Sequence, residues 1–231
     1  MPNKRRLSDA LLAWWKTNGR AFPWIGENDP YRIFVSEVLL HRTRASQVVP
    51  AYKTLIARFP TVQALAAAEP RELRAILRPL GLFWRTKYLH LAAKQMVKDY
   101  GGLVPESTEA LKALPGISDY IASAVRCFAF GRPEAIIDTN TVRILGRVLG
   151  VRVTDSSRRS KQFFESYRSL LDPQNPREFN HAILDLGALI CKPSTPHCTI
   201  CPVAAMCIYG MRIAKESKGV SVIAKPVLPG I

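Results

Sequence analysis

The feature that most constrains this chain is a Pro-Gly pair between two helical patterns, in the stretch LPGISDYIA over residues 114–122. Pro115 fixes its own φ and Gly116 can adopt a positive φ, so the chain can reverse sharply and let another chain approach its backbone. Ser118 could cap the second helix, whose first backbone N–H groups are free to hold an anion such as a phosphodiester. The stretch therefore predicts a helix, a tight hairpin and a helix, although an ordinary helix–helix turn has the same pattern.

The charge of the chain favours a polyanionic partner. Lys and Arg number 33 against 18 Asp and Glu, which gives 231 residues a net charge of +15. A surplus of this size favours nucleic acid over a merely solvated surface. No apolar run is long enough to span a membrane, and the N-terminus lacks the apolar core of a secretory signal. We therefore expect a cytoplasmic protein of prokaryotic type that associates with the nucleoid and has no membrane partner. We also expect it to be a monomer.

Four of the five cysteines are close together in the sequence, with the spacing Cys191-x6-Cys198-x2-Cys201-x5-Cys207. Such a group, in a chain without a secretion signal, indicates a metal site in a reducing compartment. On local spacing alone, zinc and an iron–sulfur cluster both remain open, because Cys198-x2-Cys201 also fits a zinc knuckle. Cys127 lies on an apolar helical face and is expected to be a buried core thiol.

Two carboxylates lie in places where they could do chemistry. Asp138 follows the short apolar run 135–137 and precedes a predicted helix over residues 139–149, so it could be no more than the cap of that helix. Glu37 lies among apolar neighbours on a helix that Pro30 opens, where a solvent-facing glutamate is the commoner case. A carboxylate held in a fixed place can stabilise a developing positive charge and orient a water molecule.

The hairpin LPGISDY, the segment IIDTNTVR over residues 136–143 and the four closing cysteines together resemble the helix–hairpin–helix DNA glycosylases of the endonuclease III superfamily. The resemblance covers residues 7–207 and is nearer to the thymine–DNA mismatch glycosylases than to the mismatch adenine glycosylases. Ser118 and Ile25 depart from it, since the family usually has glycine and often arginine there. The resemblance implies an all-α, two-lobed fold. Its parts would be a six-helix barrel domain with the hairpin over residues 24–131, a discontinuous iron–sulfur cluster domain over 1–23 and 132–210, and a C-terminal tail over 211–231.

The resemblance also assigns roles to single residues. It implies that Asp138 is catalytic, that Glu37 and Tyr120 line the pocket for a flipped base, and that a [4Fe–4S] cluster is bound by Cys191, Cys198, Cys201 and Cys207. Lyases of the superfamily carry lysine in place of Tyr120, so we expect a DNA N-glycosylase without lyase activity. The residues expected to contact DNA are His41, Arg42, Leu82 as a wedge in the base stack, Leu114, Gly116, Ser118 and Lys192.

The expected substrate is double-stranded DNA with thymine or uracil mispaired with guanine. His41-Arg42 favours it, because the adenine enzymes usually have glutamines there. The adenine enzymes also usually carry an added C-terminal domain, and the residues after Cys207 are too few to form one. An adenine glycosylase acting on A·G or A·8-oxoguanine pairs is the alternative within this class, and a non-catalytic DNA-binding module is the alternative outside it.

Overall fold

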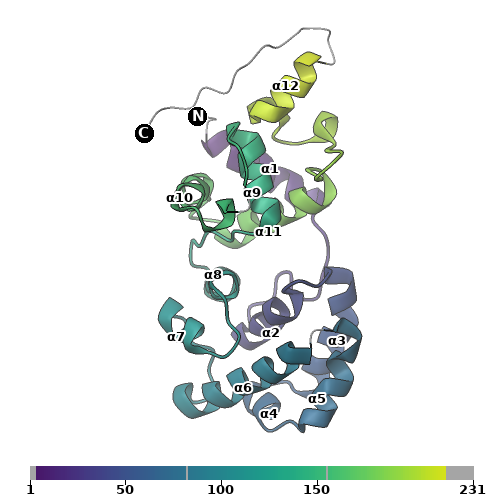
Figure 1. Ribbon diagram of the computed structural model, residues 1–231, viewed down its shortest axis with the longest axis vertical. Helices are drawn as coiled ribbons and strands as arrows, with labels where there is room; N and C mark the ends of the chain where they lie inside the picture. The colour runs from purple at the N-terminus through teal and green to yellow at the C-terminus, as the bar shows by residue number, and fades with distance from the viewer. Residues whose placement is uncertain (1–3, 82, 155, 217–231) are drawn as a thin grey trace. The chain divides into compact units, whose positions relative to one another are not determined.

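The structure is a computed structural model that describes residues 4–81, 83–154 and 156–216 (Figure 1). Every regular element in these ranges is a helix, which confirms the predicted all-α class. The α-helices are α1 (Lys4–Asn18), α2 (Pro30–Leu40), α3 (Ala45–Arg58), α4 (Val62–Ala66), α5 (Pro70–Leu77), α6 (Phe83–Tyr100), α7 (Thr108–Ala113), α8 (Asp119–Phe130), α9 (Thr139–Leu149), α10 (Lys161–Leu170), α11 (Pro176–Leu189) and α12 (Ile208–Glu216). The 3₁₀ helices are η1 (Arg78–Leu80), η2 (Ser157–Arg159), η3 (Cys198–Ile200) and η4 (Ala204–Met206). None of the described helices is both long and apolar enough to cross a membrane.

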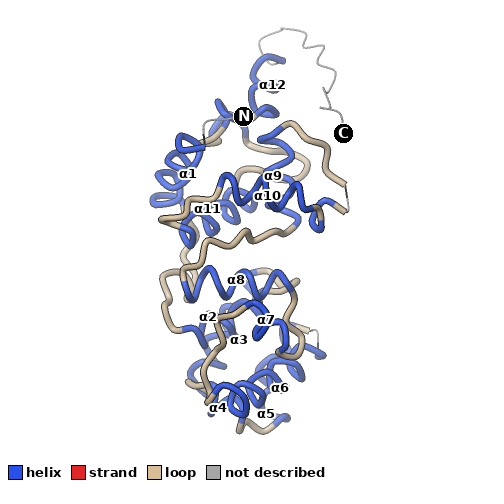
Figure 2. Tube along the Cα trace, turned by 90° about the vertical axis from the view of Figure 1, so that its left-hand side faces the viewer, coloured by secondary structure: helices blue, strands red, loops and turns tan. Residues whose placement is uncertain are grey.

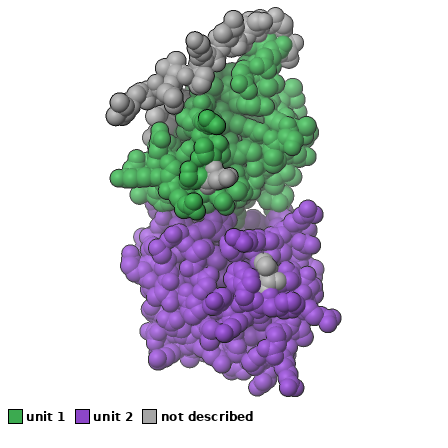
Figure 3. Space-filling model, viewed as in Figure 1, with its two compact units in different colours: residues 1–20, 135–231 green, residues 21–134 purple. Residues whose placement is uncertain are grey.

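The chain divides into two compact units, which Figure 3 distinguishes by colour. Unit 2 is the continuous stretch 21–134, and unit 1 combines residues 1–20 with the chain from residue 135 onward. The corresponding domain boundaries predicted from the sequence lie at residues 24 and 131. Helix α12 runs to Glu216, so the first residues of the predicted tail are helical, and this helix packs on α9.

Unit 2 is built around α2, which is buried along most of its length. Asp29 caps this helix by accepting a 2.9 Å hydrogen bond from the Tyr31 backbone N–H, and Pro30 occupies the first turn, where no N–H donor is needed. The apolar face of α2 packs against α3, α6 and α8. Helix α6 packs in turn on α4 and α5, and both views place it between α7 and α5 (Figures 1 and 2).

Unit 1 joins the first helix of the chain to its C-terminal half through one buried carboxylate. Asp185 on α11 is only 5% exposed. Its Oδ2 accepts hydrogen bonds from Trp15 Nε1 and from the Arg20 backbone N–H, each 2.9 Å long, and its Oδ1 accepts one of 2.6 Å from Arg20 Nε. Burying this charge is tolerated because three donors at the end of α1 surround it.

The predicted helix–hairpin–helix is present as α7, residues 114–118 and α8. Ser118 Oγ accepts a 3.3 Å hydrogen bond from the Ile121 backbone N–H and so caps α8, as expected from the sequence. Gly116 has φ +77°, and a Cβ atom added to it would lie 2.7 Å from Tyr88 Cβ on α6. Glycine is therefore required at this position both by the backbone conformation and by the close packing of the hairpin on α6.

Replacing Gly116 with alanine tests this packing. Gly101 is a matched control, because it has φ +62° but open space around its Cβ position. Both alanine variants strain the backbone, whereas only Gly116→Ala also drives a methyl group into Tyr88. We expect Gly116→Ala to lower the free energy of unfolding by about 1–3 kcal/mol more than Gly101→Ala in urea titrations. Equal losses in the two variants would contradict the packing argument.

Candidate active site and cysteine pocket

Asp138 is the N-cap of α9, in unit 1, and both of its carboxylate oxygens have partners. Its Oδ1 accepts a 2.7 Å hydrogen bond from the Thr141 backbone N–H, and Thr141 Oγ1 accepts one of 2.7 Å from the Asp138 backbone N–H. This is a reciprocal capping box, and it is anchored because Thr141 is fully buried. Asn140 Nδ2 donates a 2.8 Å hydrogen bond to Oδ2. The half-buried carboxylate is thus held in one orientation while it remains accessible.

A further set of hydrogen bonds connects Asp138 to the cysteine segment. Arg143 Nη2 donates to Asn140 Oδ1 at 2.9 Å and to the Gly187 carbonyl at 3.0 Å, and Arg143 Nε donates to the Cys191 carbonyl at 2.9 Å. Asn140 in turn donates to Asp138. The orientation of the Asp138 carboxylate is therefore coupled, through two side chains, to the backbone of the first cysteine.

Glu37 lies on α2, in unit 2, in an environment unlike that of Asp138. Glu37 is 4% exposed, and its neighbours Ser36 and Val38 are also buried. Burial raises the pKa of Glu37 from its ordinary value of 4.5 to about 8. The interpretation that Glu37 faces solvent, which is the commoner case for such a sequence, is therefore wrong. At neutral pH the Glu37 carboxyl is mostly protonated, and it can donate a hydrogen bond as well as accept one.

The end of α2 is held by a residue that the sequence reading did not single out. Arg85 on α6 is 3% exposed. Its Nη1 donates to the Leu39 carbonyl at 2.6 Å and to Thr43 Oγ1 at 3.0 Å, and its Nη2 donates to the His41 carbonyl. The guanidinium thus satisfies carbonyl groups that the end of a helix leaves without partners. A sequence cannot reveal a contact of this kind between residues 46 positions apart.

The segment that Arg85 holds carries two of the predicted DNA contacts. Arg42 is exposed and has φ +61°, a left-handed conformation that non-glycine residues seldom adopt. Burial lowers the pKa of His41, and the nearby Arg42 and Arg85 charges lower it further. His41 is therefore mostly neutral at pH 7, and Arg42 supplies the cationic side chain at this place.

The hairpin and the start of α6 surround a common pocket in unit 2. Pro115, Gly116 and Ile117 line it together with His41 and Trp84. Helix α6 begins at Phe83, so Phe83, Trp84 and Arg85 are helical, whereas the sequence suggested a turn over residues 80–85. The chain has already reversed in η1 and at Gly81, which has φ +65°, and this lets α6 start earlier.

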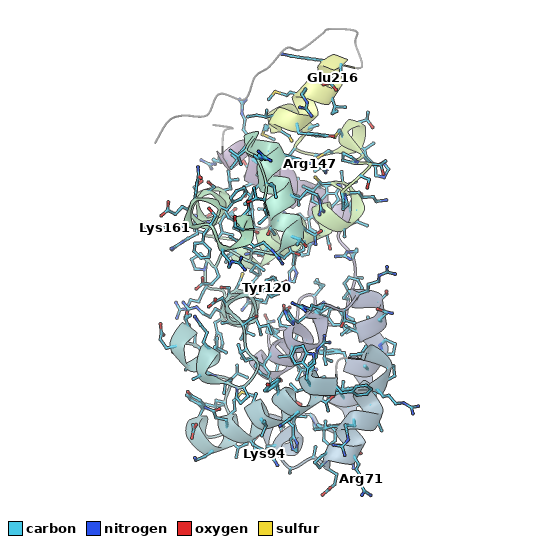
Figure 4. All side chains as sticks on the ribbon, viewed as in Figure 1. Arg71, Lys94, Tyr120, Arg147, Lys161 and Glu216 are labelled. Atoms are coloured by element: carbon cyan, nitrogen blue, oxygen red, sulfur yellow. The ribbon has the colours of Figure 1, made fainter. Side chains whose placement is uncertain are left out.

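The remaining predicted contacts differ in how accessible they are. Tyr120 is half-buried in the first turn of α8 (Figure 4), and the side chain of Lys192 is exposed. The side chain of Leu114 is only 2% exposed and belongs to the core, so only its backbone is available to DNA. Leu82, the predicted wedge, lies outside the described residues. Asp138 belongs to unit 1, and Glu37 belongs to unit 2.

The four clustered cysteines line one pocket in unit 1, with apolar walls from α9 and α11 that include Ile144 and Leu186. Backbone N–H groups point at two of the sulfur atoms. The Cys201 sulfur accepts from Val203, and the Cys207 sulfur accepts from Tyr209 and, at 3.4 Å, from Gly210. Hydrogen bonds of this kind stabilise thiolates that ligate a metal cluster.

A basic residue closes the rim of this pocket. Arg147 Nη1 lies 3.3 Å from Cys191 Sγ and donates to the Lys192 carbonyl at 2.7 Å, and its guanidinium carbon lies 4.9 Å from the centre of the Tyr209 ring (Figure 4). Within the described ranges, no three His, Cys, Asp or Glu side chains are grouped as ligands of one metal ion. Four thiols that line one pocket are a donor set that a metal cluster or a zinc ion can use.

The raised pKa of Glu37 predicts a specific dependence of stability on pH. The folded state keeps the proton up to about pH 8, whereas the unfolded chain loses it near the ordinary pKa of 4.5. The contribution of Glu37 to stability therefore falls as the pH rises through this window, by up to about 1.4 kcal/mol per pH unit. Glu37→Gln removes this loss, so the variant should gain stability relative to the unaltered protein from pH 5 to pH 8.

Urea titrations at several pH values measure this difference. The exposed Glu109 on α7 supplies the control. A Glu109→Gln variant should keep the pH profile of the unaltered protein. If Glu37→Gln also keeps that profile, Glu37 is not held neutral by burial.

Known proteins resemble this chain in sequence and in fold. Residues 35–169 match the family model described as "HhH-GPD superfamily base excision DNA repair protein". A thymine-DNA glycosylase of Aeropyrum pernix is 41% identical over 204 residues, which cover 86% of this chain and 92% of that protein. A human adenine DNA glycosylase is 33% identical over 217 residues, which cover 90% of this chain and 40% of that protein. The solved structure of a thermostable thymine-DNA glycosylase superposes with a TM-score of 0.84 at 30% identity, covering 90% of this chain and 97% of that chain.

The chain therefore belongs to the HhH-GPD superfamily of base excision DNA repair proteins. This confirms the family that the sequence pattern indicated. Within that family, the relatives named for thymine and those named for adenine both match nearly the whole of this chain.

Proposed function

We propose that this chain is a monofunctional DNA glycosylase that removes thymine or uracil mispaired with guanine and leaves an abasic site in double-stranded DNA. The observation that carries the proposal is the 41% identity to a protein named thymine-DNA glycosylase, over nearly the full length of both chains. The +15 net charge suits a DNA substrate. A base inside a duplex is out of reach of any side chain, so the target must leave the stack before the reaction.

Asp138 is the residue we assign to bond cleavage. Breaking the N-glycosidic bond builds positive charge on the sugar, and a nearby carboxylate stabilises that charge and orients or deprotonates the attacking water. The hydrogen bonds from Thr141 and Asn140 fix the carboxylate without occupying all of its acceptor positions. These contacts support a pre-organised charge, which needs little rearrangement during the reaction.

Glu37 is assigned to the leaving base. A pyrimidine leaves with negative charge on its ring, and a neutral carboxyl group can donate a hydrogen bond to that charge. The pKa of about 8 that burial gives Glu37 keeps this proton in place at neutral pH. Tyr120 supplies a phenol where a Schiff-base mechanism needs an amine, so we propose that the DNA strand stays intact.

The substrate is assigned to the thymine group on two grounds. The turn after α2 carries His41 and Arg42, which resemble the basic pair of the thymine enzymes. A. pernix thymine-DNA glycosylase is also more similar to this chain than the human adenine enzyme, at 41% against 33% identity. The adenine enzymes nevertheless match 90% of this chain, so release of adenine from A·G or A·8-oxoguanine pairs is the second candidate.

We also propose that the cysteine pocket holds a [4Fe–4S] cluster. The ligands would be Cys191, Cys198, Cys201 and Cys207, which all line one pocket with backbone N–H donors aimed at two of the sulfurs. A cluster with all four irons bound to thiolates has no open position for water, and it would supply structural cross-linking or electron transfer instead of hydrolysis. Arg143 and Arg147 hold the backbone of its first ligand segment.

The assignment of Asp138 is tested by Asp138→Asn. Asparagine caps helices about as well as aspartate, so the variant should fold and bind DNA while its carboxylate charge is lost. We expect single-turnover base release from a G·T duplex to fall by at least about 100-fold. Asp29→Asn is the control, because Asp29 caps α2 in the same way and has no catalytic assignment. Near-normal base release by Asp138→Asn would return this residue to a purely capping role.

The cluster is tested by Cys198→Ser. Purified unaltered protein should be brown and contain about four irons and four sulfides per chain. Cys198→Ser should lose most of this iron and unfold at lower temperature, whereas Cys127→Ala, at the buried thiol outside the pocket, should keep its iron. An anaerobic preparation that is colourless and contains one zinc ion per chain would contradict the proposal.

A further inference from the structure

Helix α5 and the turn after it present a row of arginines that none of the roles above uses. Leu73 and Leu77 are buried on the inner side of α5. Arg71, Arg74 and Arg78 follow one another at intervals of three and four residues, so they lie along the opposite face, and all three are exposed. Figure 4 shows Arg71 projecting outward from α5.

These arginines share an open hollow with an aromatic ring. Its lining consists of Arg71, Arg74, Arg78, Ala75 and Phe83. Phe83 is 65% exposed, the third most exposed large apolar residue among those described. Guanidinium groups bind phosphates through paired hydrogen bonds, and an exposed aromatic ring packs on a sugar or a base.

The charge of the hollow is not neutralised by the protein. No acidic residue lines it, and none of its three arginines forms an ion pair within the described ranges. Glu72, the acidic residue within α5, is engaged by Arg58, which donates to its carboxylate. Three uncompensated cations in one concavity repel each other, so the hollow favours an anion that spans several charges.

The position of the hollow indicates which polyanion this is. Phe83 begins α6, and the next residues of that helix, Trp84 and Tyr88, line the pocket that the hairpin residues Pro115 and Gly116 also line. Helix α6 lies between α7 and α5 in both views (Figures 1 and 2). A duplex held at the hairpin and crossing the first turn of α6 would therefore reach the arginines of α5.

We propose that Arg71, Arg74, Arg78 and Phe83 form a second site for the DNA backbone, which binds the phosphates of the duplex arm beyond the start of α6. The inference rests on the proposed function, because it takes the DNA substrate as its ligand. This site extends the footprint along the duplex and does not touch the target base. Its contribution is to the affinity for duplex DNA.

The test compares two variants with the same loss of charge. In Arg74→Gln/Arg78→Gln the altered residues are four positions apart and lie in the hollow. In Lys94→Gln/Lys98→Gln they are also four positions apart and exposed, but lie on α6 outside it. Dissociation constants of a G·T duplex are measured over a range of salt concentrations, together with hydroxyl-radical footprints.

Each phosphate contact contributes about 0.9 to the slope of log affinity against log salt. We expect the arginine variant to lose about 1.8 from this slope and to bind at least about tenfold more weakly near 0.1 M salt. Its footprint should also lose protected sugars at one end of the duplex. The lysine variant should keep the slope and the footprint of the unaltered protein.

Equal slopes and footprints in the two variants would overturn the inference and leave the arginines as solvated surface or as a site for an acidic protein. Base release by the unaltered protein is measured on the same duplex. Its absence would refute the proposed function, whereas normal release with an unchanged arginine variant would refute only the second backbone site.

Discussion

The candidate site depends on the hydrogen bonds that the Asp138 carboxylate accepts at the start of α9. One oxygen completes a capping box with buried Thr141, and the other is held by Asn140. Arg143 then connects Asn140 to the Cys191 and Gly187 carbonyls. A helix cap is normally a local device, but here its geometry depends on α11 and on the cysteine segment. Loss of order in the cysteine pocket should therefore disturb the carboxylate as well as the fold.

The two proposed catalytic carboxylates differ because their surroundings differ. Asp138 is half-exposed and has polar donors on both oxygens, an environment that suits a charged group. Glu37 is surrounded by the apolar core of α2, and burial alone raises its pKa to about 8. One carboxylate is thus suited to stabilise positive charge on the sugar, and the other to donate a hydrogen bond to the departing base.

The sequence predicted those features that depend on local backbone chemistry. The hairpin at Pro115-Gly116, the Ser118 cap and the capping role of Asp138 all follow from residues within four positions of each other. Contacts between distant segments could not be predicted in this way. Arg85 reaches the end of α2 across 46 positions, and Gly116 is confined by Tyr88 as well as by its own φ. Leu114 looked like part of a DNA-binding loop, yet its side chain packs into the core.

The measurement that tests the central claim most directly is the identity of the base released from a panel of duplexes. Each duplex carries one G·T, G·U, A·G or A·8-oxoguanine pair, and the free base is identified by mass spectrometry while the strand is examined for breaks. The account predicts release of thymine and uracil opposite guanine, with an intact strand until hot alkali cleaves the abasic site. Release of adenine alone would move the protein to the second candidate function. Release of no base from any duplex would contradict the assignment of a glycosylase.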